Sequence, residues 1–140
     1  CLGAVGPYGA YLADGSEYRG NYGVSEDVLR DFHHRRMELL WQAGADLLLI
    51  ETQPSLAEAK VELSIAEELG AEAWVSFSCR DGSHIHEGDL IRECAAELAQ
   101  TPADGGRQLH AAPVCGASDR SAQGGLQPAG GGLSQQRRDL

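Results

Sequence analysis

The 140-residue sequence has neither a long apolar run nor a surplus of basic residues. It contains 11 Lys and Arg against 21 Asp and Glu, which gives a formal net charge of -10. Nucleic acids and anionic membrane surfaces both bind basic proteins, so this charge argues against either as a partner. No segment approaches the roughly 18 consecutive apolar residues that span a bilayer. The chain begins with Cys1 and shows no basic and apolar leader, so we expect no targeting segment.

Cysteine and nucleotide-binding motifs are also scarce. The four cysteines form no C-x-x-C pair and no tight cluster (Cys1, Cys79, Cys94 and Cys115). This spacing predicts neither a local structural zinc site nor a disulfide framework, and it favours a reducing, cytoplasmic setting. The glycine patterns G-x-G-x-x-G and G-x-x-x-x-G-K-[ST] are absent, which weakens the case for nucleotide binding.

Large apolar residues become rare toward the end of the chain. Residues 101–140 contain no aromatic residue and hold 8 of the 18 glycines. Such a segment cannot bury enough apolar surface to offset the entropy lost on ordering. We therefore predict a folded domain at 1–100 and a low-complexity, disordered tail at 101–140.

Apolar runs and helix signals alternate within residues 1–100. The runs predict strands at 1–6, 47–50 and 73–79, and helices are expected from Ser25, from Ser55 and from near Asp89. Ser55-Leu56-Ala57-Glu58 has the pattern of a capping box, whereas no helical period is found in the loop at 7–23. Alternating strands and helices predict an α/β fold with a parallel sheet. Periodicity alone leaves open a barrel segment or a doubly wound sheet.

Three segments lie at the carboxyl ends of the predicted strands, where parallel α/β folds bind their ligands. They are the turn at 6–9, Glu51-Thr52, and the segment at 76–79. Glu51 comes directly after four aliphatic residues, so its carboxylate is suited to bind an ammonium group or to act as a base. The alternative is a glutamate that caps a helix or tethers a loop.

The histidines and tyrosines allow two interpretations each. His84 and His86 follow Cys79 closely, as in some zinc sites, but a polar, solvated loop is favoured because no fourth ligand is evident. His33 and His34 lie among charged residues of a predicted helix, and both are expected on its exposed surface. The four tyrosines between residues 8 and 22 either line a pocket or pack the long loop.

Three segments resemble the homocysteine S-methyltransferase family. They are G-A-V-G-P-Y-G-A-Y-L-A-D-G-S-E-Y-R-G-N-Y at 3–22, A-G-A-D-L-L-L-I-E-T-Q-P-S-L-A-E-A at 43–59, and A-W-V-S-F-S-C-R-D-G at 73–82. The resemblance covers about the first 98 residues and is nearest to the branch that uses S-methylmethionine or S-adenosylmethionine. It implies a (β/α)8 TIM barrel, of which this chain would supply strands three to five.

The resemblance also implies a chemistry. In the family, zinc held by three cysteine thiolates binds the sulfur of homocysteine and lowers its pKa, so that a thiolate attacks the methyl group of a sulfonium donor and methionine forms. The partners implied are small molecules. The glutamate that contacts the amino group of homocysteine matches Glu51, and Thr52 and Ser76 are expected beside it in the pocket.

The zinc ligands of the family are missing from this sequence. They lie in an N-C motif after the sixth strand and a G-G-C-C motif after the eighth, and neither motif occurs here. We therefore expect a fragment of a zinc-dependent methyltransferase that is inactive by itself. The alternatives are a non-catalytic binding module derived from a truncated barrel, and a relative that uses betaine or methyltetrahydrofolate.

The tail is compatible with a shifted reading frame. Read one nucleotide out of frame with freely chosen codons, residues 104–116 permit M-V-V-G-N-C-T-P-P-R-F-V-A, and 127–139 permit S-L-P-V-V-V-Y-P-N-S-G-E-I. The first resembles the family's sixth strand with its zinc-binding N-C, and the second its seventh strand. We predict that nucleotide sequencing across codons 95–140 finds one inserted or deleted base between Leu98 and Asp104. Codons that cannot encode these motifs in the shifted frame would refute the hypothesis.

Overall fold

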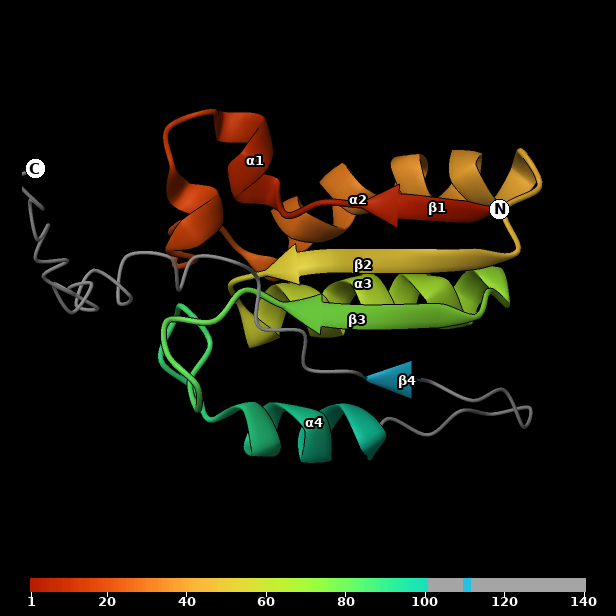
Figure 1. The fold of residues 1–140 in the computed structure, drawn as a ribbon. Helices are drawn as coiled ribbons and strands as arrows, with labels where there is room; N and C mark the ends of the chain where they lie inside the picture. The colour runs from red at the N-terminus through yellow and green to blue at the C-terminus, as the bar shows by residue number, and fades with distance from the viewer. Residues whose placement is uncertain (101–109, 112–140) are drawn as a thin grey trace, which may run out of the picture.

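The computed structural model describes residues 1–100 and 110–111, and its strands form one parallel sheet (Figure 1). The strand order is β1-β2-β3-β4. The strands are β1 (Leu2–Val5), β2 (Leu47–Gln53), β3 (Ala73–Phe77) and β4 (His110–Ala111). The predicted parallel α/β arrangement is confirmed. β4 falls inside the segment predicted as a tail, and the other residues of 101–140 lie outside the described part.

Helices connect consecutive strands. α2 (Glu26–Gln42) follows β1, α3 (Leu56–Leu69) follows β2, and α4 (Ile91–Ala99) follows β3. The loop between β1 and α2 also contains α1 (Tyr8–Leu12) and the 3-10 turn η1 (Ser16–Tyr18), so the prediction of a loop without helix was wrong. Both elements are too short to produce a helical period in the sequence.

Side-chain caps define where the two long helices begin. The hydroxyl of Ser25 accepts a hydrogen bond from the N–H of Val28, and that of Ser55 accepts one from the N–H of Glu58, both at 3.4 Å. Gly70, with φ 66°, ends α3 in the left-handed conformation that glycine adopts easily. The predicted capping box is only half formed, because the Glu58 side chain bonds Tyr8 and His33 instead of Ser55.

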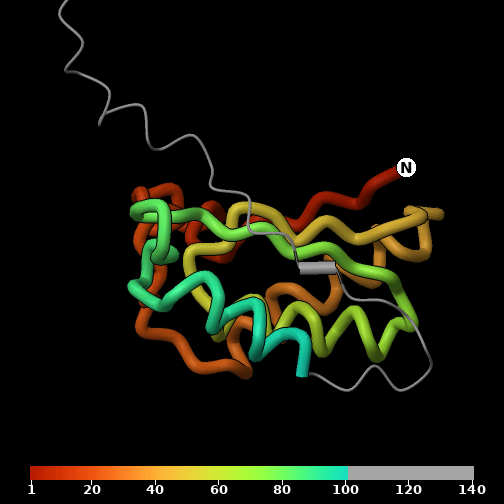
Figure 2. The backbone as a smooth tube through the Cα atoms, turned by 60° about the horizontal axis from the view of Figure 1, so that its bottom comes forward, coloured from red at the N-terminus to blue at the C-terminus, as the bar shows by residue number. Residues whose placement is uncertain are grey.

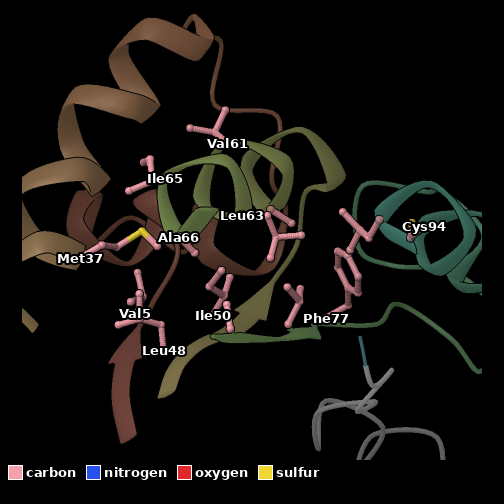
Figure 3. Close-up of a cluster of buried hydrophobic side chains, with 14 of the residues drawn as sticks. Val5, Met37, Leu48, Ile50, Val61, Leu63, Ile65, Ala66, Phe77 and Cys94 are labelled. Atoms are coloured by element: carbon pink, nitrogen blue, oxygen red, sulfur yellow. The ribbon is translucent and has the colours of Figure 1, made fainter. Parts of the chain in front are cut away.

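The hydrophobic core lies between the sheet and the helices (Figure 3). Alternate residues of β1, β2 and β3 point toward α2 and α3, and they include Leu48 and Ile50 of β2, both with no exposed surface. Burying one such side chain contributes about 1.5–3 kcal/mol. The buried stripe of α2 consists of Leu29, His33 and Met37. The buried position of His33 differs from the exposed surface expected from its charged sequence neighbours.

The opposite face of the sheet is uncovered in the described part of the chain. Ala4, Leu49 and Trp74 are register partners in a row across three strands, and Trp74 is 44% exposed. Figure 2 shows α2, α3 and α4 together on one side of the strands. The helices of the described residues include none with the length and apolar character needed to cross a membrane.

Gly9 offers a test of the tight packing in the first loop. A Cβ atom at Gly9 would lie 2.5 Å from the backbone nitrogen of Glu17 and 2.6 Å from the Tyr22 ring, whereas one at Gly6 would have no atom within 4 Å. We expect Gly9→Ala to lower the free energy of unfolding by about 1–3 kcal/mol. Gly6→Ala should change it by less than about 0.5 kcal/mol. Chemical denaturation of both variants measures this, and equal losses would contradict the described loop packing.

Candidate functional site at the carboxyl ends of the strands

The carboxyl ends of β1, β2 and β3 lie at one edge of the sheet, together with α1, η1 and the loop before α4 (Figure 1). Val5 and Ile50 are partners in the β1–β2 register, so Gly6 continues alongside Glu51. Phe77 pairs with Gln53, which places the residues after β3 at the same edge. The three polar segments singled out in the sequence therefore meet here.

Glu51 lies on the open face of the sheet. Leu48 and Ile50 are buried toward the helices, so the alternation of β2 turns Leu49 and Glu51 to the other side, where both are half-buried. Among the described residues, no hydrogen bond or ion pair involves the Glu51 carboxylate. The carboxylate is thus available to a cationic group at the end of the strand.

Thr52 interrupts this alternation. Its φ of 60° is in the left-handed region, and the β2–β3 register shifts between Ile50 and Gln53. For a β-branched residue, such a conformation costs roughly 1–3 kcal/mol. The Thr52 N–H donates to the hydroxyl of Ser76 at 3.0 Å instead of to a strand carbonyl. The structure therefore joins Thr52, the residue after Glu51, to Ser76 of β3.

Two loops contact each other at this edge. The N–H of Asn21 donates to Glu87 at 2.8 Å, and the N–H of Glu87 donates to the carbonyl of Pro54 at 3.1 Å. The rings of Tyr18 and His86 lie 6.4 Å apart in an edge-on arrangement. The loop that contains η1 is thereby joined to the loop before α4, next to the end of β2.

The two histidines of the second loop have different surroundings. Nδ1 of His84 lies 2.9 Å from the carboxylate of Asp81, and this hydrogen bond lowers the pKa of Asp81 to about 2. Burial, with a smaller effect of the Arg80 charge, lowers the pKa of His86. Within the described residues, no group of three metal-ligand side chains includes either histidine. His84 therefore belongs to a polar loop.

A buried polar cluster lies on the helix side of the sheet. The side chains of His33, Glu58 and Glu62 have no exposed surface. Nε2 of His33 is 2.7 Å from Oε1 of Glu58, and Nδ1 is 3.2 Å from Oε1 of Glu62. The prediction of an exposed His33 was wrong, because its charged sequence neighbours outweighed its position one turn from both Leu29 and Met37.

The cluster extends to the strand end and to the first loop. Gln53 donates to Oε1 of Glu62 at 3.3 Å, and the backbone N–H of Tyr8 donates to Oε1 of Glu58 at 2.5 Å. Burial and the nearby Glu58 charge raise the pKa of Glu62 well above its ordinary value. Burial, followed by the charge of Glu58, also raises the pKa of Tyr22. The sequence signal for this cluster is a pair of glutamates one turn apart that share the buried face of α3 with apolar residues such as Ala59 and Ile65.

Comparison with known proteins identifies the family. The model of the homocysteine S-methyltransferase family matches residues 1–112. The chain belongs to the homocysteine S-methyltransferase family. A homocysteine S-methyltransferase of Bacillus subtilis is 54% identical over 96 residues, which are 68% of this chain and 30% of that protein. A homocysteine S-methyltransferase of Escherichia coli is 49% identical over 104 residues, or 71% of this chain and 33% of that protein.

A solved structure supports the same assignment. The metallated form of the homocysteine methyltransferase MmuM from Escherichia coli matches with a TM-score of 0.68 and 46% sequence identity. The match covers 71% of this chain and 35% of that chain. This chain thus spans about a third of the length of the family members that it matches.

The described residues do not fit the thiolate metal centre that the family implies. Cys1 is exposed before β1, at the opposite end of the sheet from Cys79, which follows β3. Cys94 is buried in α4, and burial together with the charge of Asp89 raises the pKa of its thiol to about 11, away from the thiolate form that binds metal. The cluster around His33 is fully buried on the helix side, where no substrate could reach a metal. Cys115 lies outside the described residues.

Thiol alkylation tests this arrangement of cysteines. We expect iodoacetamide at pH 8 to modify exposed Cys1 readily and buried Cys94 at least about tenfold more slowly, because the reactive species is the thiolate. Peptide mass spectrometry after timed quenching measures the two rates. Added zinc should leave both rates unchanged, and protection of Cys1, Cys79 and Cys94 together by zinc would show that they form a metal site.

Proposed function

We propose that this chain is part of an enzyme that transfers a methyl group from S-methylmethionine or S-adenosylmethionine to homocysteine. The sulfur of homocysteine attacks the methyl carbon, the bond from that carbon to the sulfonium sulfur breaks, and the donor leaves as a neutral thioether. The homocysteine thiol loses its proton, and methionine is the product. Membership of the family supports this reaction, and Glu51 at the end of β2 is the observation in this chain that carries the proposal.

Glu51 binds the α-ammonium group of the acceptor in this proposal. Its position on the open face, with no described partner for the carboxylate, suits a charge-assisted hydrogen bond to an amine. A relative from Astragalus bisulcatus that is 44% identical over 98 residues is named a selenocysteine methyltransferase. Homocysteine and selenocysteine share the amino acid group and differ in the side chain that carries the nucleophile, so a carboxylate that binds the α-ammonium group is compatible with either acceptor.

Thr52 and Ser76 complete the proposed pocket beside Glu51. The bond from the Thr52 N–H to the Ser76 hydroxyl fixes the end of β2 against β3. Gly6 directly follows β1, and it is the expected neighbour of Glu51 on the other side because Val5 pairs with Ile50. The amino acid end of the substrate would therefore bind between the ends of three neighbouring strands.

The proposed whole enzyme is a (β/α)8 barrel in which β1, β2 and β3 are the third to fifth strands. The uncovered face with Ala4, Leu49 and Trp74 then becomes the barrel interior. The zinc site of this enzyme lies outside the described residues, because their cysteines are too dispersed to form it. A single chain of this length lacks most of the barrel and is expected to be inactive.

The activity of the chain can be measured directly. We expect the purified 140-residue protein to form no methionine from homocysteine with either sulfonium donor in the presence of zinc. A longer product of the same gene, read in the frame that restores the missing motifs, should form methionine. Betaine and methyltetrahydrofolate are assayed in parallel, and activity with only these two would contradict the sulfonium donor.

Glu51→Gln in the longer product tests the residue itself. Loss of the charge should raise the KM for homocysteine on the order of 10- to 100-fold and change kcat less, because a hydrogen bond to a charged group is lost. Glu72→Gln is the matched control, since Glu72 is an exposed carboxylate at the amino end of β3. An unchanged KM in Glu51→Gln would contradict the proposed role.

A further inference from the structure

The side chain of Glu58 connects three separate elements. It extends from α3, accepts the N–H of Tyr8 at the start of α1, and lies 2.7 Å from Nε2 of His33 on α2. Tyr8 is 50 residues away in the sequence and His33 is 25 residues away. Both contacts use the same oxygen, Oε1. The Glu58 side chain lies in the core and is fully excluded from solvent.

The Tyr8 N–H needs an acceptor from elsewhere in the chain. The first N–H groups of a helix have no partner within the helix, and side chains of the N-cap residue usually supply one. The N-cap of α1 is Pro7, whose side chain offers no hydrogen-bond acceptor. Glu58 therefore takes the role of a cap that the local sequence cannot supply.

Tyr8 lies close to the turn at the end of β1. Gly6 directly follows Val5, the register partner of Ile50, and Tyr8 comes only two residues later. Gly9, the next residue, packs against the backbone of Ser16 and Glu17. A displacement of Tyr8 would thus move both the turn at 6–7 and the loop above it.

His33 contacts Glu58 from the neighbouring helix α2. Nε2 of His33 lies 2.7 Å from Oε1 of Glu58, and both side chains are fully buried. Glu62 lies on the next turn of α3, 3.2 Å from Nδ1 of His33. The aromatic ring of Tyr8 adds an edge-on contact with Phe32, at 5.0 Å between centroids.

We propose that the buried pair Glu58–His33 is a positioning device that fixes the first loop of the site through the backbone N–H of Tyr8. Only one part of this proposal rests on the proposed function, namely that the loop containing Tyr8 faces the substrate. Glu58 is a positioning residue in this scheme, since it contacts no substrate. The experiments below measure the loop directly, so they can fail or succeed independently of any methyl transfer.

The first experiment uses the unmodified 140-residue chain, labelled with ¹⁵N and ¹³C. A hydrogen bond from Tyr8 to Glu58 transmits a scalar coupling between the Tyr8 amide nitrogen and the side-chain carboxyl carbon of Glu58. We expect a cross-peak between these two nuclei in a long-range amide-to-carboxyl spectrum. A folded chain without this cross-peak, or with one that joins Tyr8 to another acceptor, would overturn the proposal.

The second experiment compares hydrogen exchange in matched variants. Glu58→Leu should speed exchange at Tyr8 about tenfold relative to Leu48, whose N–H bonds the carbonyl of Glu72 within the sheet. Glu58→Gln keeps an oxygen acceptor and should restore most of the protection. Glu62→Leu is the control, because Glu62 is equally buried on the same helix but does not contact Tyr8.

The outcomes separate positioning from general core packing. If Glu58→Leu and Glu62→Leu raise Tyr8 exchange equally, or Glu58→Gln restores nothing, the cluster is only part of the core and the proposal is wrong. Exchange is also measured with a metal chelator and with added Zn²⁺. We expect no change at Tyr8, and a loss of protection on chelation would show that a bound cation holds Glu58, which would also overturn the proposal.

Discussion

A parallel sheet is stable only when apolar layers cover both of its faces. α2 and α3 supply one layer here, and their contacts with β1, β2 and β3 form the core of the described chain (Figure 3). The second face carries Leu49 and Trp74 and has no layer within the described residues. This asymmetry decides where chemistry can occur, because Glu51 turns toward the uncovered side while the polar cluster around His33 is enclosed on the other.

The two polar regions have opposite requirements. Glu51 is half-buried at a strand end, where its carboxylate has no partner among the described residues. A carboxylate in the core needs neighbouring polar groups, and Oε1 of Glu58 lies within hydrogen-bond distance of the Tyr8 N–H and of Nε2 of His33.

The sequence was informative wherever structure depends on nearby residues. The caps at Ser25 and Ser55, the strand at 47–50 and the location of Glu51 after it all follow from local patterns. The inward position of His33 was not predicted, because charged neighbours in the sequence conceal a residue that packs against a helix 25 positions away. Glu58 was assigned to a capping box for the same reason, since its true partner at Tyr8 is brought close only by the tertiary fold.

The left-handed conformation of Thr52 has a consequence for exchanging parts between family members. Without it, the alternation of β2 would send Gln53 to the same face as Glu51, whereas in this fold Gln53 bonds Glu62 in the core. Residues 51–62 therefore combine a carboxylate on the open face, a change of face and two core carboxylates in a single stretch. In chimaeric proteins, crossover points before Glu51 or after Glu62 keep the change of face and the bond from Gln53 to Glu62 within one parent sequence.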